Sequence, residues 1–345
     1  MSIFVRPADL SSERRDLLDV LKVNLPFLDH EKRFDWLYRA NPDGPARSWF
    51  ACQDTRDRIV GVVSVFPRSM WVGRDLKNCG QVGDFATAVS HRSLGPSLLM
   101  QRATFEPVNA GIWAFCYDCP PHDAGMSTFR RLGMEANSSM ARYALPLRVD
   151  RLLESRLGRN WSFLSAVGNF ILKLYVAPPT RIQDVEIKQH TGPFGEEFSA
   201  LDESIKDEHA IRGARSAAHL NWRYLQDPLQ QYEVLTARRD GELLAYLVLC
   251  IADGTATVVD LFGKEISTVG ASLISAVVRR CRPSCQILQT FLAESSELTT
   301  LYTEAHFRQR SISARIVAYT KPDSDMSAFL RNGARWAFAQ AEVRA

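Results

Sequence analysis

Apolar and polar positions alternate in the same order in two parts of the chain. Each part is predicted to contain two strands joined by a polar turn that suits a β-hairpin. The predicted strand, turn and strand are Ser48–Cys52, Asp54–Arg58 and Ile59–Phe66 in the first part, and Tyr232–Ala237, Arg238–Gly241 and Glu242–Ile251 in the second. The shared order of elements indicates two related units.

A short motif precedes each predicted hairpin. The spacing W-x-Y-x-x-x-P begins at Trp36 and recurs at Trp222, 186 residues later. A period of this length is typical of a duplicated domain and not of a solenoid, whose repeats are much shorter. The motif therefore predicts that the chain arose by duplication of one folding unit.

The two parts also agree downstream of the hairpins. Each continues with a buried strand containing an aspartate, an apolar helix, a further strand and a short helix, and a final strand pair is expected to close each part. The strands are Gln81–Val89 and Thr255–Phe262, then Gly111–Tyr117 and Gln286–Phe291. The short helices are expected to end near Gly133 and His306. The offset falls from 186 to about 173, which loop deletions would cause.

A helical pattern lies between the two parts. Apolar residues recur at i, i+3, i+4 and i+7 from Phe163 to Tyr175, and Pro178-Pro179 ends the helix. In one interpretation this amphipathic helix packs the two domains together. In the other it lies on a membrane surface, because basic flanks and aromatic residues also suit a bilayer. We therefore expect domains at residues 1–150 and 181–345, joined by a linker helix at 151–180.

Composition narrows the class of protein. The chain has 345 residues, of which 46% are hydrophobic and 23% charged, as is typical of globular proteins. A formal net charge of +3 is too small to indicate a nucleic-acid-binding protein, which usually carries a large excess of positive charge. The sequence starts without a secretory signal pattern, and no run approaches the ~20 apolar residues of a membrane span. We expect a cytoplasmic protein.

The cysteines favour the same compartment. Seven cysteines without a regular spacing form no disulfide framework, so reduced thiols are the simpler interpretation. Cys116 and Cys119 have CxxC spacing, but there is no second CxxC to complete a zinc site. We therefore expect no metal.

The strand at Gln81–Val89 leads into a helix through a loop that suits an anion. The first turn of a helix exposes unpaired N–H groups and the positive end of the helix dipole, so a loop around them can hold a phosphate. Gly95 allows close backbone approach, Pro96 suits the first helical turn, and Arg92 can add a charged donor. The loop is neither a GxGxxG motif nor a P-loop.

In this order of elements, and in this loop, the chain resembles the GNAT superfamily of N-acyltransferases. The resemblance covers most of residues 1–146 and recurs more faintly over 183–320, so the chain looks like a tandem-GNAT protein. The resemblance implies an α/β (α+β) fold with two GNAT-like domains. Each would have a mixed, mostly antiparallel central sheet flanked by helices.

The resemblance also implies a donor substrate and the residues that hold it. The superfamily's pyrophosphate loop is Gln/Arg-x-x-Gly-x-Gly/Ala, and Arg92-Ser-Leu-Gly95-Pro-Ser97 matches it except for Ser97 at the last position. The donor would be acetyl-CoA or another acyl-CoA. Its expected contacts are Thr87, Ala88, Val89, Arg92, Ser93, Leu94, Gly95, Pro96 and Ser97.

Candidate catalytic residues are divided between the halves. Acyl transfer to an amine needs a base for the ammonium proton and an acid for the leaving thiolate. Asp84 is a candidate base, with pairing to a nearby Arg as its structural alternative. His122 follows Pro121 and is either a cofactor donor or base or a loop histidine. Tyr302 matches the family's acid, whose place in the first half is taken by Phe129.

Neither half carries the full set of family residues. The second half has Ser267-Thr-Val-Gly270-Ala-Ser272 at its loop, with no Arg or Gln anchor. We therefore expect the first half to bind acyl-CoA and the second half, degenerate for cofactor, to supply a wall for the acceptor. The reverse assignment, with a catalytic second half, is the alternative.

The sequence thus predicts an acyl-CoA-dependent N-acyltransferase. The expected acceptor is a primary amine of an amino sugar or small metabolite, with no nucleic-acid partner. Association with a membrane surface is the less favoured alternative. A non-catalytic binding or scaffold protein on the same fold is one alternative. Aminoacyl transfer from charged tRNA is another, and the low net charge disfavours it.

Overall fold

The structure is a computed structural model of the chain. It describes residues 3–53, 58–92, 94–121, 123–148, 184–207, 210–322 and 324–343. The linker helix expected at 151–180, with both of its interpretations, lies outside the described residues. The predicted site residues Ser93 and His122 also lie outside them. No helix of the described part is both long and apolar enough to cross a membrane.

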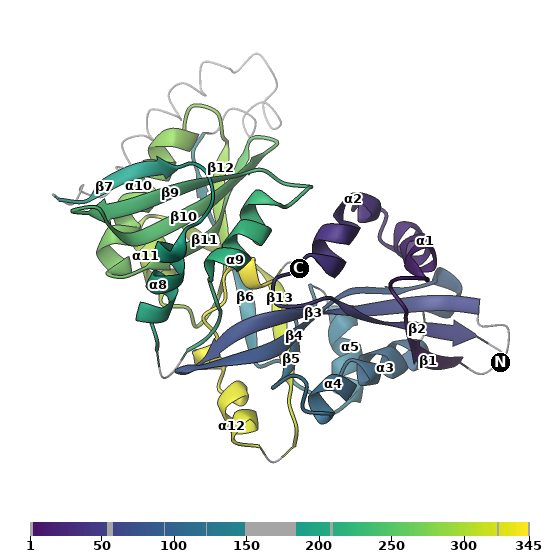
Figure 1. Cartoon of the computed structure of the whole chain (residues 1–345). Helices are drawn as coiled ribbons and strands as arrows, with labels where there is room; N and C mark the ends of the chain where they lie inside the picture. The colour runs from purple at the N-terminus through teal and green to yellow at the C-terminus, as the bar shows by residue number, and fades with distance from the viewer. Residues whose placement is uncertain are drawn as a thin grey trace.

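Helices and strands follow one another in a similar order in the two halves (Figure 1). The first half contains β1 (Ile3–Pro7), α1 (Arg14–Asn24), α2 (His30–Phe34), η1 (Asp35–Arg39), β2 (Arg47–Gln53), β3 (Arg58–Val72), β4 (Asp75–Thr87), η2 (Val89–His91), α3 (Leu94–Ala103), α4 (Glu106–Asn109), β5 (Cys116–Asp118), α5 (Asp123–Arg131) and β6 (Ser138–Pro146). The second contains β7 (Glu186–His190), α8 (Glu196–Ser204), β8 (Ile211–Gly213), α9 (Ala217–Leu220), η4 (Asn221–Leu225), β9 (Tyr232–Arg239), β10 (Glu242–Ala252), β11 (Thr255–Gly263), α10 (Ile266–Cys281), β12 (Ile287–Ala293), α11 (Leu298–Glu304), β13 (Arg308–Tyr319), α12 (Asp325–Arg331), η5 (Gly333–Arg335) and η6 (Gln340–Glu342).

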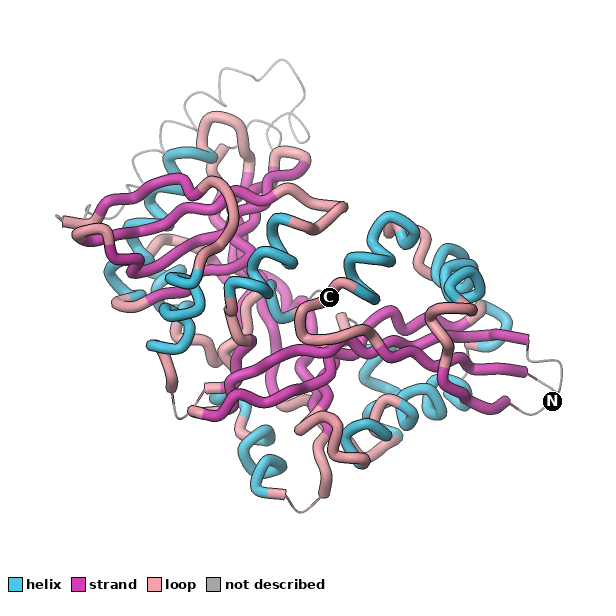
Figure 2. The backbone as a smooth tube through the Cα atoms, in the orientation of Figure 1, coloured by secondary structure: helices cyan, strands magenta, loops and turns pink. Residues whose placement is uncertain are grey.

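The strands of both halves form one continuous sheet (Figure 2). The order is β1-β2-β3-β4-β5-β13-β6-β12-β11-β10-β9-β7, with β8 paired to β3. Neighbouring strands on this path are antiparallel except for β4 with β5 and β11 with β12. Helices flank the sheet. The predicted mixed, mostly antiparallel α/β architecture is therefore confirmed.

The halves exchange their last strands. β6 of the first half pairs with β12 of the second, and β13 of the second half pairs with β5 of the first. β6 and β13 also pair with each other, so they join the two halves at the middle of the sheet. The expectation that a final strand pair closes each half is therefore wrong. The alternation of apolar and polar residues predicts a strand, but it does not determine which neighbouring strand it will pair with.

The tryptophans of the repeated motif meet between the halves. The rings of Trp36 and Trp222 stack with centroids 4.9 Å apart. Each indole Nε1 donates a hydrogen bond to the other residue's carbonyl, at 2.8 Å from Trp36 and 2.9 Å from Trp222. Both lie in matching short helices, η1 and η4. The motif therefore marks a pseudo-twofold contact, as a duplication predicts.

Two strands near the site differ from their predicted bounds. β4 ends at Thr87, two residues earlier than expected, because Val89–His91 forms a single helical turn. β5 is confined to Cys116–Asp118, because the chain before it turns at Gly111 (φ +76°). The amide of Ile112 donates to the Pro107 carbonyl at 2.8 Å and closes that turn. The shortened β5 leaves much of β4 without a strand on that side.

Candidate active site

The site lies where two parallel strands part. β4 pairs with β5 only at Gly80 and Gln81. Beyond Gln81, β4 continues along β3 as far as Thr87, which pairs with Gly61. A register shift in this stretch coincides with a positive φ of +46° at Asp84, which marks a bulge in β4. The edge of β4 from Val82 onward therefore faces an opening and not a neighbouring strand.

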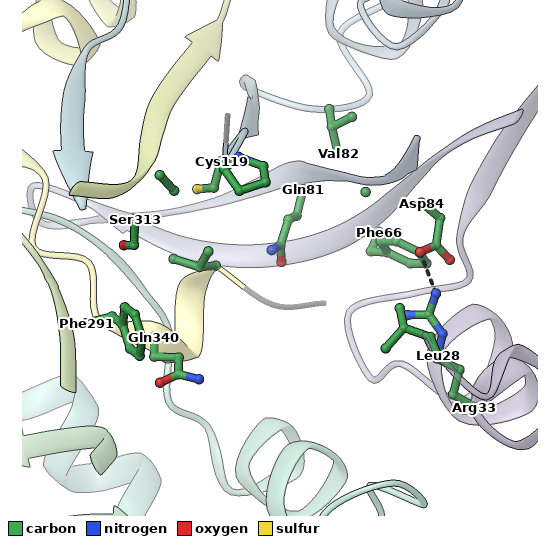
Figure 3. Close-up of a pocket in the computed structure, with 14 residues that line it drawn as sticks. Leu28, Arg33, Phe66, Gln81, Val82, Asp84, Cys119, Phe291, Ser313 and Gln340 are labelled. Atoms are coloured by element: carbon green, nitrogen blue, oxygen red, sulfur yellow. Dashed lines mark hydrogen bonds and ion pairs between the residues drawn. The ribbon is translucent and has the colours of Figure 1, made fainter. Parts of the chain in front are cut away.

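A cavity of about 490 Å³ occupies the inner end of this opening (Figure 3). The first half contributes the α1–α2 loop, α2, β3, β4 and the segment after β5. The second half contributes β12, β13 and the C-terminal segment. The lining residues are Leu28, Arg33, Phe66, Gln81, Val82, Gly83, Asp84, Cys119, Pro121, Phe291, Ser313, Ala314, Gln340 and Val343. Both halves therefore contribute to the wall of the cavity.

Asp84 lines the cavity and is firmly held. Its Oδ1 accepts from Arg33 Nη2 at 2.5 Å, and its Oδ2 accepts from the Tyr38 hydroxyl at 2.6 Å. The side chains of Arg33 and Asp84 are each 6% exposed. Burial and the neighbouring Asp84 charge hold the pKa of Tyr38 well above its usual range, so Tyr38 remains a hydrogen-bond donor. The structure thus shows the arginine pair that was the alternative for Asp84, and its role as a base stays a prediction.

The predicted donor loop stands at the other end of the opening. After Thr87 come Ala88 and the turn Val89–His91, and α3 begins at Leu94. Arg92 is exposed and donates from Nε to the Thr87 carbonyl at 3.4 Å. Open space adjoins Gly95, where a Cβ would meet no heavy atom within 4 Å. The residues present therefore fit an anionic group at the start of α3.

The corresponding loop of the second half has a different shape. β11 ends at Gly263 and α10 begins at Ile266, so two residues connect them, whereas six separate β4 from α3. Gly270, expected in the loop, lies inside α10, and a Cβ on it would stand 2.9 Å from Leu301 Cδ2. The expected placement of Ser267–Ser272 in a loop is therefore wrong.

A carboxylate stands at the start of α10. Glu265 precedes the helix with a φ of +48°, and its oxygens accept from Arg239 at 2.9 and 3.0 Å. This pair lowers the pKa of Glu265, so the group is ionised at neutral pH. A negative side chain at a helix N-terminus repels a bound phosphate.

Tyr302 is not among the residues that line the cavity. Its exposed fraction is 0%, and it packs edge-on against Phe307 with ring centroids 4.9 Å apart. Tyr302 occupies the same place in the second half as Phe129 does in the first. The Tyr302 carbonyl accepts a hydrogen bond from the amide of Phe307, and the Phe129 carbonyl accepts one from the amide of Met134. In each half the residue just before the donor has a positive φ. Burial raises the pKa of Tyr302 above its usual range. Its role as an acid remains a prediction, and the proposal below does not use it.

Asp118, where β5 leaves β4, has a perturbed carboxyl group. Burial raises its pKa to about 7, whereas an unfolded aspartate ionises near pH 4. The native state therefore holds a proton that the unfolded state releases between these values, and stability falls as pH rises from about 4 to about 7. We expect Asp118→Asn to melt roughly 5 °C above the wild type at pH 8. At pH 4 the two should melt together, and an equal shift at both pH values would contradict a titrating Asp118.

Sequence reasoning missed several residues of the site. Tyr38, which donates a hydrogen bond to Asp84, belongs to the repeated motif, and this motif was a signal of its importance. Arg33, Phe291, Ser313 and Gln340 carried no local signal, because they reach the cavity from distant parts of the chain. In the residues that the structure describes, no group of three or more His, Cys, Asp or Glu side chains could hold a metal ion.

The architecture matches solved structures. A conserved protein of unknown function from Enterococcus faecalis, described as a probable N-acyltransferase, aligns with a TM-score of 0.69 and 14% identity over 93% of this chain and 72% of its own. A GCN5-related N-acetyltransferase from Anabaena variabilis aligns with a TM-score of 0.66 and 13% identity over 92% and 72%. The chain has the GNAT fold. The resemblance inferred from sequence is thereby confirmed at the level of fold.

A third GNAT-fold neighbour binds a long acyl-CoA. Saccharomyces cerevisiae N-myristoyltransferase, solved with bound myristoyl-CoA, aligns with a TM-score of 0.57 and 10% identity over 92% of this chain and 82% of its own. No protein-family model and no curated protein sequence matches the chain. At these identities the likeness shows the fold alone, and the activity, the donor and the acceptor are matters for proposal.

Proposed function

We propose that the protein is an acyl-CoA-dependent N-acyltransferase of the cytoplasm. It moves an acetyl or other acyl group from acyl-CoA to a primary amine of an amino sugar or other small metabolite. One observation carries the proposal. β4 pairs with β5 only at Gly80 and Gln81, so its edge from Val82 to Thr87 has no neighbouring strand, and this edge runs from the cavity at Asp84 towards the start of α3.

The donor would lie along this edge. Main-chain amides at the start of α3, with Arg92, would hold the diphosphate. The free edge of β4 from Val82 to Thr87 would pair with the amides of the pantetheine arm, as an added strand pairs with a sheet edge. An amide of that edge would also donate to the thioester oxygen as negative charge develops on it.

The acceptor would enter from the cavity. Its amine nitrogen attacks the thioester carbon, the C–S bond breaks, and the products are an amide and the thiol of CoA. The amine proton leaves to a base, for which Asp84 is the proposed group, and the departing thiolate takes up a proton. Orienting the amine beside the thioester supplies a large share of the rate. Phe291, Ser313 and Gln340 of the second half would form the acceptor wall.

Assigning the donor to the first half or to the second half predicts opposite results for a pair of matched variants. Arg92→Glu places a negative charge beside the proposed diphosphate, and Ser267→Glu does the same at the start of α10. Isothermal calorimetry should show CoA binding weakened roughly 100-fold by Arg92→Glu, through lost and reversed charge contacts, and unchanged by Ser267→Glu. Loss of binding with Ser267→Glu alone would instead assign the donor to the second half.

Turnover separates an enzyme from a binding module. Thiol release from acetyl-CoA should depend on both CoA and an amine, and Arg92→Glu should abolish it. CoA binding without turnover over a wide range of amines would favour a non-catalytic scaffold. The absence of CoA binding at millimolar concentration would reject the proposal.

A further inference from the structure

We infer that Ser48 and Ser64 are positioning residues of the proposed base, Asp84. They complete a one-way chain of hydroxyl donors that runs through the Tyr38 hydroxyl to the Asp84 carboxylate. The inference rests on the proposed function and adds to it two residues that act only through Tyr38. The carrying observations are three consecutive hydrogen bonds in the first half and an apolar pair at the matching place in the second.

Three buried hydroxyl groups lie in a row behind Asp84. The Tyr38 hydroxyl donates to Asp84 Oδ2 at 2.6 Å. Tyr38 Oη lies 3.2 Å from Ser64 Oγ, and Ser64 Oγ lies 2.8 Å from Ser48 Oγ. The exposed fractions of Tyr38, Ser64 and Ser48 are 1%, 0% and 3%. The chain is therefore shielded from solvent, where consecutive hydrogen bonds polarise one another.

The number of protons sets the direction of this chain. Each hydroxyl has one proton to donate, and an ionised carboxylate has none. Burial and the neighbouring Asp84 charge hold the pKa of Tyr38 well above its usual range, so Tyr38 keeps its proton and donates it to Asp84. Tyr38 Oη must then accept from Ser64, and Ser64 Oγ from Ser48. All three donors therefore point toward the carboxylate.

Arg33 and His30 of α2 also face Asp84. Arg33 Nη2 donates to Asp84 Oδ1 at 2.5 Å and lies 3.1 Å from His30 Nδ1. Burial lowers the pKa of His30, so at neutral pH its Nδ1 can accept from Arg33 while Nε2 donates to the Leu25 carbonyl at 2.8 Å. In Figure 3 Asp84 and Arg33 lie together at one end of the cavity. The hydroxyl chain can therefore be altered without removing the charge partner of Asp84.

The second half has an apolar pair at the matching place. Ser48 lies opposite Ser64 where β2 pairs with β3, ten residues after the tyrosine of the repeated motif. Val234 lies opposite Val248 where β9 pairs with β10, also ten residues after the motif tyrosine. Both valines are buried in one apolar cluster with that tyrosine. Because this place in the sheet accepts two valines, the fold does not require the hydroxyls, and their bond to Tyr38 explains the serine pair.

The test measures how the pH dependence of kcat for thiol release changes when links of the chain are removed. A carboxylate that loses donors to its charged form takes up a proton at higher pH. Tyr38→Phe removes the direct donor, and the acidic limb should move up by about one pH unit. Ser64→Ala removes only the polarisation of that donor, and the limb should move up by about half a unit. The double variant should match Tyr38→Phe alone, because Ser64 acts only through Tyr38.

A second readout does not need turnover. Carbon NMR of the full-length protein with carboxyl-labelled aspartate follows the Asp84 titration directly, and the Arg33→Met, Asp84→Asn double variant assigns its signal. The midpoints should move as the limbs do. Should Tyr38→Phe fail to fold, Ser48→Ala carries the same test, because its combination with Ser64→Ala should match Ser64→Ala alone.

Ser275→Ala is the matched control. The Ser275 hydroxyl is buried, but it donates to the Ala271 carbonyl of its own helix at 2.9 Å and lies outside the chain. Neither the limb nor the Asp84 titration should move in this variant.

The outcomes separate this inference from the proposed function. A Ser64→Ala profile and titration equal to those of the wild type would overturn the inference while acyl transfer stands. A double-variant shift equal to the sum of the single shifts would do the same. An Asp84 titration that moves as predicted, in a protein that releases no thiol with any amine, would instead remove the proposed function and with it the catalytic role of the chain.

Discussion

Asp84→Asn is expected to abolish acyl transfer and also to destabilise the protein by roughly 3–5 kcal/mol, because it leaves a buried guanidinium without its carboxylate. The side chains of Arg33 and Asp84 are each 6% exposed, and Arg33 Nη2 lies 2.5 Å from Asp84 Oδ1. Breaking such a pair from one side costs far more than removing both charges. The loss of stability should appear as a lower midpoint in urea unfolding.

A double variant separates the structural role of Asp84 from a catalytic one. Arg33→Met combined with Asp84→Asn removes both charges and should recover most of the lost stability. If Asp84 takes the amine proton, the double variant folds and binds CoA but still fails to transfer the acyl group. Recovery of activity along with stability would show that Asp84 only positions the bulge of β4.

Separating the halves is expected to abolish folding of each one. Residues 1–150 alone would carry β6 without β12, and β5 without β13. Residues 181–345 alone would lack β6 between β12 and β13. Unpaired inner strands expose backbone groups and apolar faces, so each fragment should aggregate or show no cooperative melting.

Co-expression is the matching control. The two fragments should associate when made together, co-purify, and melt cooperatively, because the strand exchange needs both. Circular dichroism on heating provides the measurement. Two fragments that each melt cooperatively alone would contradict the exchange and favour two independent domains.

The sequence predicted what depends on local pattern. The hairpins follow from alternating residues, and the motif at Trp36 and Trp222 predicted a duplication, with which the reciprocal contact of the two stacked indoles agrees. The correspondence of Tyr302 with Phe129 also held, since both lie at the same place before a positive-φ residue. Local spacing carries such information because each element sets its own periodicity.

What the sequence could not predict depends on long-range pairing. The alternation in β6 and β13 suits any sheet edge, so their exchange could not be read from it. Asp84 and Arg33 are far apart in the chain, and no local sequence pattern predicts that they pair. The loop before α10 was misplaced because Gly270 was taken as a loop glycine, whereas it allows close packing against Leu301. Gln340 could not be predicted as a lining residue, because only the tertiary structure places the C-terminal segment against the cavity.

The central claim is that the start of α3, and not the start of α10, grips the donor. Hydrogen–deuterium exchange of the full-length protein, with and without CoA, measures this directly. We predict that CoA slows exchange in peptides covering residues 85–99, while peptides covering 262–272 exchange at the same rate. Slower exchange confined to 262–272, with no change near Arg92 and Gly95, would contradict the claim.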